Sequence, residues 1–303
     1  MLWCGDNIEI LSNFSKDSID TCITDPPYGM SMASWDSCLP NKIVWSKIFT
    51  VLKPGAFCIV FSSPRNYHRV GVDIEDAGFI IKDQIMWITT TKMASNGLKP
   101  CHEPIVVAQK PISEKTIQLN VEKWGTGKIN VSDTRIPWGK EPPKGWVAGG
   151  LKRRSFGKGT HEKGGSEKYG TVNANPNGRH PSNIIGSVLP EHQEYFYDPI
   201  INDRNAYDIY YYSGRVSTKE RNGNPHPTPK PESLMSYLVK LFCPPSGVVL
   251  DPFSGSGTTG VASIKENKRY IGIEINNEYF DFSKRRIYDL LKTTSIIEKL
   301  LKI

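Results

Sequence analysis

The sequence has few of the features that mark secreted, membrane or zinc-binding proteins. Its six cysteines lie far apart, with no C-x-x-C pair and no Cys/His cluster at zinc spacing, which predicts reduced thiols packed mostly in a core and no metal site. No apolar stretch approaches the ~20 residues needed to span a bilayer. The N-terminus carries Asp6 and Glu9 where a signal peptide would have a basic and then an apolar segment. We therefore expect a soluble cytoplasmic protein that has no membrane partner.

The composition of the 303 residues is that of an ordinary globular protein. Hydrophobic residues make up 38% and aromatic residues 10%, which suits one large core or two modest ones. Lys and Arg number 38 against 31 Asp and Glu, leaving a net charge of +7. A basic balance fits a polyanionic partner but does not identify one, because many proteins with this charge never bind nucleic acid.

Short β-type runs alternate with helical patterns over residues 1–110. Three segments are predicted as buried strands: 20–24, 56–61 and 104–108. Between the first two, residues 42–52 have apolar side chains at helical spacing, and Lys53-Pro54-Gly55 follows as a stop signal. Strands that alternate with helices predict a parallel sheet covered by helices on both faces.

The C-terminal stretch, residues 223–303, returns to the same α/β pattern. Its predicted helices are 232–242, 258–266 and a long one from about 278, and its predicted strands are 247–250 and 269–273. The middle stretch, residues 111–222, differs: Gly, Lys and Arg crowd Trp138–Gly170, which cannot bury enough apolar surface to fold tightly by itself. We therefore predict one sheet built from residues 1–110 and 223–303 and interrupted by an insert at 111–222.

A glycine-rich segment follows one of these strands and opens a helix. It reads Asp251-Pro252-Phe253-Ser254-Gly255-Ser256-Gly257-Thr258-Thr259-Gly260. Glycines allow the backbone to pass close beneath a ligand, and a helix N-terminus offers free N–H groups to an anion. Glu274 ends the next predicted strand, where nucleoside-binding Rossmann-like units place a carboxylate that binds ribose hydroxyls. The combination predicts a nucleoside-containing cofactor rather than a tight turn beside a surface acid.

A second motif, Asp25-Pro26-Pro27-Tyr28, follows the strand predicted at 20–24. The prolines hold the chain extended, so a backbone carbonyl and the Asp25 carboxylate can together accept both hydrogens of an –NH₂ group. The exocyclic amine of adenine or cytosine is a poor nucleophile, because its lone pair is delocalised into the ring. Accepting both N–H bonds favours a nucleophilic nitrogen and stabilises the positive charge that develops on it. Tyr28 is placed to stack on the base.

Together these motifs resemble the amino-methylating DNA methyltransferases. The catalytic tetrapeptide comes first, the basic insert second and the cofactor loop last, an order similar to that of the circularly permuted β group of this family. Four further pieces match: Gly5-Asp6-Asn7 through Leu11, Leu52-Lys53-Pro54-Gly55, His102-Glu103-Pro104 and Asn224-Pro225-His226-Pro227-Thr228-Pro229-Lys230-Pro231. The resemblance covers roughly residues 1–110 and 180–290.

The resemblance implies a Rossmann-like α/β fold, circularly permuted, that binds S-adenosyl-L-methionine and requires no metal. It assigns cofactor-binding roles to Asp6, Thr228, Lys230, Asp251, Phe253, Gly255, Gly257, Thr258, Thr259 and Glu274. Glu274 would hold the ribose and Asp6 would lie by the adenine. Thr228 and Lys230 would meet the methionine carboxylate. Catalytic roles fall on Asp25, Pro26, Pro27 and Tyr28, and the aromatic face of Tyr28, like that of Phe253, would meet the sulfonium.

The resemblance also implies double-stranded DNA as the partner. A base inside a duplex cannot reach such a pocket, so the enzyme would flip its target base out of the helix. Basic side chains of the insert would contact phosphates: Lys152, Arg153, Arg154 and Lys158. The alternative is that they belong to a solvated loop. We further predict that Trp138–Gly170 is mobile and becomes ordered on DNA.

Three functional classes stay open: a DNA amino-methyltransferase, an RNA or protein methyltransferase, and a DNA-binding module with an inactive site. RNA- and protein-methylating relatives usually carry Asn at the position of Asp25 and place the cofactor loop first. The intact tetrapeptide and glycine loop argue against an inactive site. Within the first class, Asp25 favours adenine N6 over cytosine N4. Members of the group often pair, so a homodimer is a further expectation.

Overall fold

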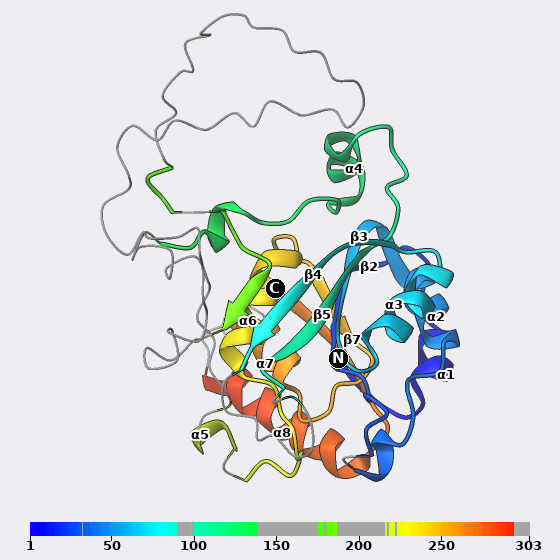
Figure 1. Ribbon diagram of the computed structural model, residues 1–303, viewed down its shortest axis with the longest axis vertical. Coiled ribbons are helices and arrows are strands. Elements are labelled where there is room, and N and C mark those ends of the chain that lie inside the picture. Colours follow the sequence, from blue (N-terminus) through cyan, green and yellow to red (C-terminus); the bar gives the residue numbers. More distant parts are fainter. Residues whose placement is uncertain are drawn as a thin grey trace, which may run out of the picture.

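The computed structural model describes residues 1–31, 33–89, 98, 100–137, 175–178, 180–186, 216, 218–221 and 223–293. Over these residues the chain forms one eight-stranded sheet with helices on both faces (Figure 1). In spatial order its strands are β1 (Leu2–Cys4), β8 (Arg269–Glu274), β7 (Val248–Asp251), β2 (Ile19–Thr24), β3 (Leu52–Phe61), β5 (His102–Gln109), β4 (Ile80–Ile88) and β6 (Ile184–Gly186). Strands from the two ends of the chain lie side by side in the middle of the sheet, where β2 pairs with β7.

The sheet is mixed, and the expectation of a wholly parallel sheet was wrong. β5, which contains the predicted strand 104–108, runs antiparallel to both of its neighbours, β3 and β4. The other neighbouring pairs are parallel. A parallel pairing of two consecutive strands requires a crossover connection, usually through a helix, whereas an antiparallel pairing does not. β5 instead pairs with the strand that precedes it, with Ile105 opposite Ile85.

Two hydrophobic clusters lie on the two faces of the sheet. Helices α1 (Asn7–Leu11), α2 (Ile43–Val51) and α3 (Tyr67–Asp76) cover one face, and α6 (Glu232–Phe242), α7 (Thr258–Lys265) and α8 (Asn277–Thr293) cover the other (Figure 1). On the first face Trp45 and Ile48 pack against strand residues such as Val60. On the second, Leu238 and Val261 belong to the cluster that includes the rest of the buried side chains of α6. The expected double covering of the sheet is confirmed.

The helices read from apolar spacing occur close to their predicted limits. Helix 232–242 was predicted with the bounds that α6 has, and α2, α7 and α8 begin or end within one residue of expectation. α2 ends at Val51, shortly before Lys53-Pro54-Gly55, but that segment lies inside β3, which begins at Leu52, four residues before the strand predicted from Ala56. Gly55 has φ +81°, and a β-carbon there would lie 2.5 Å from the side chain of Asn120. Glycine permits this close approach.

The described parts of the 111–222 stretch contact the rest of the protein. They include α4 (Ile117–Trp124), a 3₁₀ turn at Ser132–Thr134 and β6, which pairs in parallel with β4. The amide of Asn130 donates a 2.8 Å hydrogen bond to the carbonyl of Leu241 in α6. The short helix α5 (Thr218–Arg221) follows near the end of this stretch. Trp138–Gly170 lies outside the described residues.

The cysteines are free thiols, as predicted. Cys22, Cys58 and Cys243 are buried, whereas Cys4 and Cys38 are exposed, so half of the cysteines serve as core side chains. Within the part of the chain that the structure describes, no helix is long and apolar enough to cross a membrane. The same residues contain no group of three or more His, Cys, Asp or Glu side chains arranged to hold a metal ion.

Candidate active site

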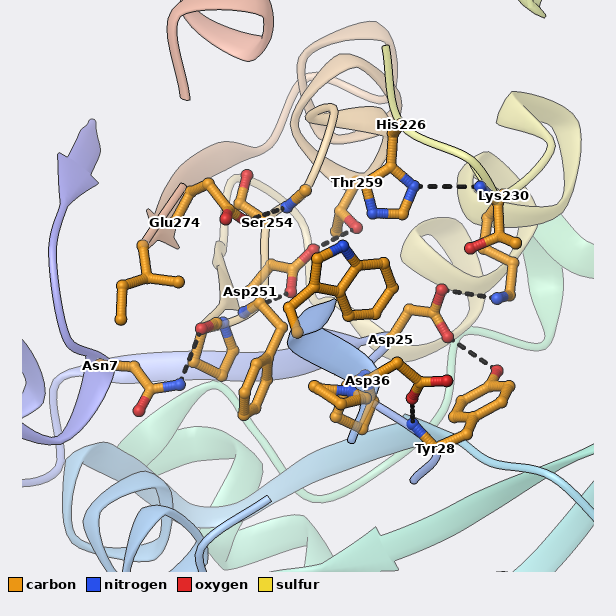
Figure 2. Close-up of a pocket in the computed structure, with 18 of the residues that line it drawn as sticks. Asn7, Asp25, Tyr28, Asp36, His226, Lys230, Asp251, Ser254, Thr259 and Glu274 are labelled. Carbon is orange, nitrogen blue, oxygen red and sulfur yellow. Dashed lines mark hydrogen bonds and ion pairs between the residues drawn. The ribbon is translucent and has the colours of Figure 1, made fainter. Parts of the chain in front are cut away.

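The candidate site is a cavity of about 1050 Å³ at the carboxyl ends of three adjacent strands. Asp25 follows β2, Asp251 ends β7 and Glu274 ends β8, and all three line the cavity (Figure 2). Open α/β sheets bind ligands at the carboxyl ends of their strands. Thirteen of the fourteen residues predicted for catalysis or cofactor binding line this cavity: Asp6, Asp25, Pro26, Pro27, Tyr28, Thr228, Lys230, Asp251, Phe253, Gly255, Thr258, Thr259 and Glu274.

Asp251 is a buried carboxylate held by three donors. The hydroxyl of Thr24 donates to its Oδ1 at 2.6 Å, and the hydroxyl of Thr259 donates to its Oδ2 at 2.6 Å. The amide of Phe253 donates to Oδ1 at 3.1 Å. Burial raises the pKa of Asp251 from 3.8 to about 6, although these hydrogen bonds act in the opposite direction. Asp251 therefore joins the end of β2, which precedes the tetrapeptide, to the glycine-rich loop.

Glu274 holds the glycine loop in place from the next strand. Its Oε2 accepts a 2.7 Å hydrogen bond from the amide of Gly255, and its Oε1 accepts one of 2.8 Å from the amide of Asn276. Burial raises the pKa of this carboxyl, and the backbone donors lower it. Each carboxylate oxygen has more than one acceptor direction. Glu274 can therefore anchor the loop and still accept hydrogen bonds from ligand hydroxyls in the cavity.

Gly257 is the predicted cofactor residue that does not line the cavity. It precedes α7 with φ +78°, and a β-carbon at this position would lie 2.2 Å from the hydroxyl oxygen of Ser283 in α8. Its absent side chain allows α8 to pack against the start of α7. Gly257 therefore supports the loop on the side that packs against α8, whereas Gly255, two residues earlier, faces the cavity.

Asp6, predicted to lie by the adenine of the cofactor, and Thr228, predicted to meet its methionine carboxylate, both line the cavity. Asp6 is exposed and caps α1, with Oδ1 accepting hydrogen bonds from the second and third amides of the helix. The side chain of Asn7 donates to the carbonyl of Pro252 at 3.1 Å, which ties α1 to the glycine loop. Thr228 is exposed, and its amide donates to Nδ1 of His226 at 3.3 Å. Burial lowers the pKa of His226 to about 4, so its ring is neutral at pH 7.

Lys230 contacts the catalytic tetrapeptide directly. Its ammonium lies 2.5 Å from Oδ2 of Asp25, whose Oδ1 accepts a 2.7 Å hydrogen bond from the hydroxyl of Tyr28 (Figure 2). The same ammonium lies 3.6 Å from Oε2 of Glu103. Lys230 was expected at the methionine carboxylate. The structure instead pairs it with two carboxylates of the protein, and the cofactor contact stays a prediction.

The charged groups of this cluster shift one another's pKa values. Burial lowers the pKa of Lys230, but Asp25 and Glu103 more than offset that effect, so the pKa is raised and the ammonium stays charged. Burial raises the pKa of Asp25, Lys230 lowers it and Glu103 raises it, with a raised pKa as the result. Burial and the same two carboxylates raise the pKa of Tyr28 well above its usual value. Tyr28 is therefore a protonated donor toward Asp25.

Two residues missed by the sequence analysis fix the backbone of the tetrapeptide. Asp36, in the 3₁₀ turn Ser34–Asp36, is buried and accepts hydrogen bonds from the amides of Tyr28 at 2.6 Å and Gly29 at 2.9 Å. Asn66 donates to the carbonyl of Tyr28 at 2.6 Å. Neither position carries a local sequence signal, because each depends on loops that meet only in the folded chain.

Glu103 and His226 were noted only as parts of matching motifs, without a role. Glu103 stands at the start of β5 and is 8% exposed, and its place immediately before the predicted buried strand 104–108 was the available signal. His226 lies against Trp35, with ring centroids 5.4 Å apart. The predicted phosphate contacts, Lys152, Arg153, Arg154 and Lys158, lie outside the described residues.

The fold and the cavity define a Rossmann-like methyltransferase, with a cofactor loop and an acidic tetrapeptide facing one another. The profile of the N6/N4 DNA methylase family matches residues 19–285. The Type II methyltransferase M2.MboI of Moraxella bovis is 36% identical over 294 residues, which cover 95% of this chain and 88% of that protein. The chain belongs to the N6/N4 DNA methylase family.

Solved structures share the fold at low sequence identity. The putative DNA modification methylase TTHA0409 of Thermus thermophilus, complexed with S-adenosyl-L-methionine, aligns with a TM-score of 0.51 at 20% identity, covering 97% of this chain and 96% of that one. The cytosine-N4-specific PvuII DNA methyltransferase aligns with a TM-score of 0.54 at 15% identity, covering 96% and 90%. These likenesses extend over both α/β stretches of the chain.

Proposed function

We propose that this protein transfers a methyl group from S-adenosyl-L-methionine to the N6 amino group of adenine in double-stranded DNA. The observation that carries the proposal is the position of Asp25. Its carboxylate follows β2, lines the cavity that Asp251 and Glu274 share, and is held by Tyr28 and Lys230. A partly buried acceptor beside a nucleoside pocket suits an amino group as the methyl acceptor.

The residues of the cavity fit the cofactor. Glu274 presents a nearly buried carboxylate where ribose hydroxyls would lie, and Gly255 brings the backbone to the cavity wall without a side chain. When bound, S-adenosyl-L-methionine supplies a methyl group on a sulfonium, which leaves as a neutral thioether. The rim positions of Asp6 and Thr228 suit the adenine and methionine ends, the roles that we propose for them.

The chain's own groups would orient the acceptor. Asp25 accepts a hydrogen bond from an N–H of the amino group. This makes the nitrogen lone pair more available to form the N–C bond. As that bond forms and the C–S bond breaks, the nitrogen becomes positive, and the carboxylate stabilises it and takes the proton that it loses. Tyr28 keeps Asp25 oriented through its 2.7 Å hydrogen bond. The base must leave the duplex to arrive here, so the proposal includes base flipping.

The base identity is the finer part of the proposal. Asp25 can accept hydrogen bonds from the amino group of adenine or of cytosine, and the fold is shared with a cytosine-N4-specific enzyme. Adenine is favoured by Asp at the first tetrapeptide position. Lys152, Arg153, Arg154 and Lys158 are the proposed phosphate contacts, and the division into 1–110, 111–222 and 223–303 is the proposed domain organisation. A homodimer remains a proposal, which sedimentation velocity would test.

The test is methyl transfer to unmethylated duplex DNA, followed by digestion to nucleosides and mass spectrometry. N6-methyladenine is the expected product. N4-methylcytosine would keep the mechanism and overturn the base assignment. Bound cofactor without any methylated nucleoside, in a parallel assay that includes RNA and protein acceptors, would overturn DNA as the substrate.

A further inference from the structure

The Lys230 ammonium occupies the carboxylate that has to receive the amino group. It lies 2.5 Å from Oδ2 of Asp25, and the other carboxylate oxygen already accepts the Tyr28 hydroxyl (Figure 2). The side chains of Lys230 and Asp25 are 9% and 22% exposed, so water screens their attraction only in part. Taken alone, this pair has no net charge. An uncharged pair would do little to stabilise the positive charge that develops on a methylated amine.

Glu103 changes this balance. It comes from a different strand, β5, and reaches the same ammonium from another side, with its Oε2 3.6 Å from Lys230. Its side chain is 11% exposed, comparable to that of Lys230. The hydroxyl of Tyr28 also lies 3.3 Å from Oε2 of Glu103. Two carboxylates therefore share one ammonium, and when both are ionised the three groups together carry one negative charge.

We infer that Glu103 is a positioning residue of the methyl-transfer reaction, which takes up the charge of Lys230 and leaves Asp25 free to act on the amino group. The inference rests on the proposed function. Lys230 needs to move only slightly from Asp25 toward Glu103 to release Oδ2. The Lys230 ammonium already lies 3.6 Å from Oε2 of Glu103, slightly beyond hydrogen-bond distance. Glu103 touches neither the base nor the methyl group in this scheme, and it acts through Lys230 and Tyr28.

The aromatic surroundings keep the ammonium on this short path. Lys230 lies over the ring of Tyr28 at 5.3 Å and over the ring of Phe61 at 5.1 Å from the centroids. Both distances are within the range of cation–π attraction. The ammonium therefore has favourable contacts on the way from one carboxylate to the other, and the release of Asp25 does not require Lys230 to enter water.

The central experiment is single-turnover methyl transfer by Glu103→Gln, with saturating cofactor and duplex DNA. The variant keeps the shape of the side chain and removes its charge. We expect the rate to fall about 100-fold, in the range seen when one electrostatic interaction with a transition state is removed. Cofactor affinity should change by less than about threefold. Flipping of 2-aminopurine placed at the target position, measured by fluorescence with S-adenosylhomocysteine bound, should also be retained.

Three further variants separate charge from structure. Glu103→Met removes the charge without leaving a buried amide, so it serves if the Gln variant unfolds, and it should lose rate to the same extent. Glu103→Asp keeps the charge and should recover most of the rate. Glu266→Gln is the matched control, because Glu266 pairs with Lys240 at 3.3 Å at a site outside the cavity. It should retain the rate of the unaltered protein.

The pH profile gives the readout that a purely structural role would not move. Asp25 acts in its ionised form, so the rate falls as the pH drops through its pKa. Glu103 raises that pKa, and its removal should shift the acid limb of the profile to lower pH. Among the described residues, the other charged or titratable groups facing this cluster include Lys230, Tyr28, His226, Asp251 and Asp36, and they stay unchanged in the variant.

A reduced rate with a shifted acid limb, and with cofactor binding and base flipping retained, supports the inference. A rate within about threefold of the unaltered protein overturns it. It is also overturned by a loss of rate without a shifted limb, or by a loss that follows cofactor affinity or base flipping. If the unaltered protein methylates no base in DNA, the proposed function has failed, and that result is distinct from each of these.

Discussion

Thr24 donates a 2.6 Å hydrogen bond to Asp251, although 227 residues separate them. The bond joins the end of β2 to the end of β7, so it connects the strand that carries the tetrapeptide to the strand that carries the glycine loop. Both side chains are almost completely buried. The two halves of the site are therefore aligned by a contact within the sheet, independently of any ligand.

Replacing Thr24 by Val should destabilise the protein by about 1.5–3 kcal/mol, because a buried carboxylate loses a donor. Denaturant unfolding monitored by circular dichroism measures the change. The matched control is Thr126→Val, which removes a 2.6 Å bond to the carbonyl of Pro54. That carbonyl is neutral and keeps a second donor, Asn120, so the control should lose only about 1 kcal/mol. Equal losses in the two variants would contradict the assigned importance of the Asp251 charge.

Stability should depend on pH through Asp251. Its folded pKa of about 6 lies above its usual 3.8, so burial of the ionised form opposes folding. The contribution of this carboxyl is fully favourable below about pH 4 and is lost as the pH rises through about 6. Asp251→Asn cannot titrate, so the stability of the unaltered protein relative to this variant should fall by about 3 kcal/mol from pH 4 to pH 7. Parallel stability curves for the two proteins would refute this.

Replacing Asp25 by Ala should greatly slow transfer and spare cofactor binding. We expect a rate loss of about 10²–10³-fold, because the acceptor for the amino group is gone. Calorimetric titration with S-adenosyl-L-methionine should give an affinity within about threefold of that of the unaltered protein. A comparable loss of cofactor affinity would mean that Asp25 belongs to the cofactor pocket or is needed for the fold.

Gly257→Ala should be more damaging than the same change at Gly125. Both glycines have φ +78°, so each alanine would incur a backbone cost of about 1–2 kcal/mol. A β-carbon at Gly125 meets nothing within 4 Å, whereas one at Gly257 lies 2.2 Å from the hydroxyl oxygen of Ser283. We expect a further loss of about 1–3 kcal/mol at Gly257 from overpacking. Thermal unfolding of the two variants compares them, and similar melting temperatures would contradict the packing argument.

The basic run in the insert should affect DNA binding through salt dependence. Changing Lys152, Arg153 and Arg154 together to Ala should weaken binding on every sequence, because phosphate contacts carry no base information. The slope of log affinity against log salt should shrink by about 0.9 for each phosphate that the protein no longer neutralises. Fluorescence anisotropy on specific and unrelated duplexes measures both effects. An unchanged slope would show that the run is a solvated segment. In a companion measurement, bound DNA should protect Trp138–Gly170 from proteolysis.

Much of the fold could be predicted because helices and buried strands leave local patterns. Apolar residues spaced along one face placed α6 at Glu232–Phe242, and the short β-type run Thr21-Cys22-Ile23-Thr24 placed β2. The direction of β5 could not be read in this way. A buried antiparallel strand and a buried parallel strand have the same apolar composition, so their pairing depends on which neighbour the folded chain supplies.

Local sequence motifs were enough to identify the acids, glycines and prolines of the site. Asp25, Asp251 and Glu274 each follow or end a predicted strand, and the carboxyl ends of neighbouring parallel strands must meet at one edge of a sheet. The sequence by itself therefore determined the class of the protein and fourteen candidate site residues, thirteen of which line the cavity. These inferences rest on local motifs, on their resemblance to a known family and on the geometry common to all such sheets.

Only the tertiary structure decided which charges share that cavity. Lys230 lies 205 residues from Asp25 in the sequence, and Glu103 reaches the Lys230 ammonium from β5. No local pattern states that one ammonium lies between two carboxylates, because the distances arise from the packing of separate strands and loops. Coulomb energy falls with distance and rises with burial, so the role of Glu103 follows from coordinates that the linear order of residues does not contain.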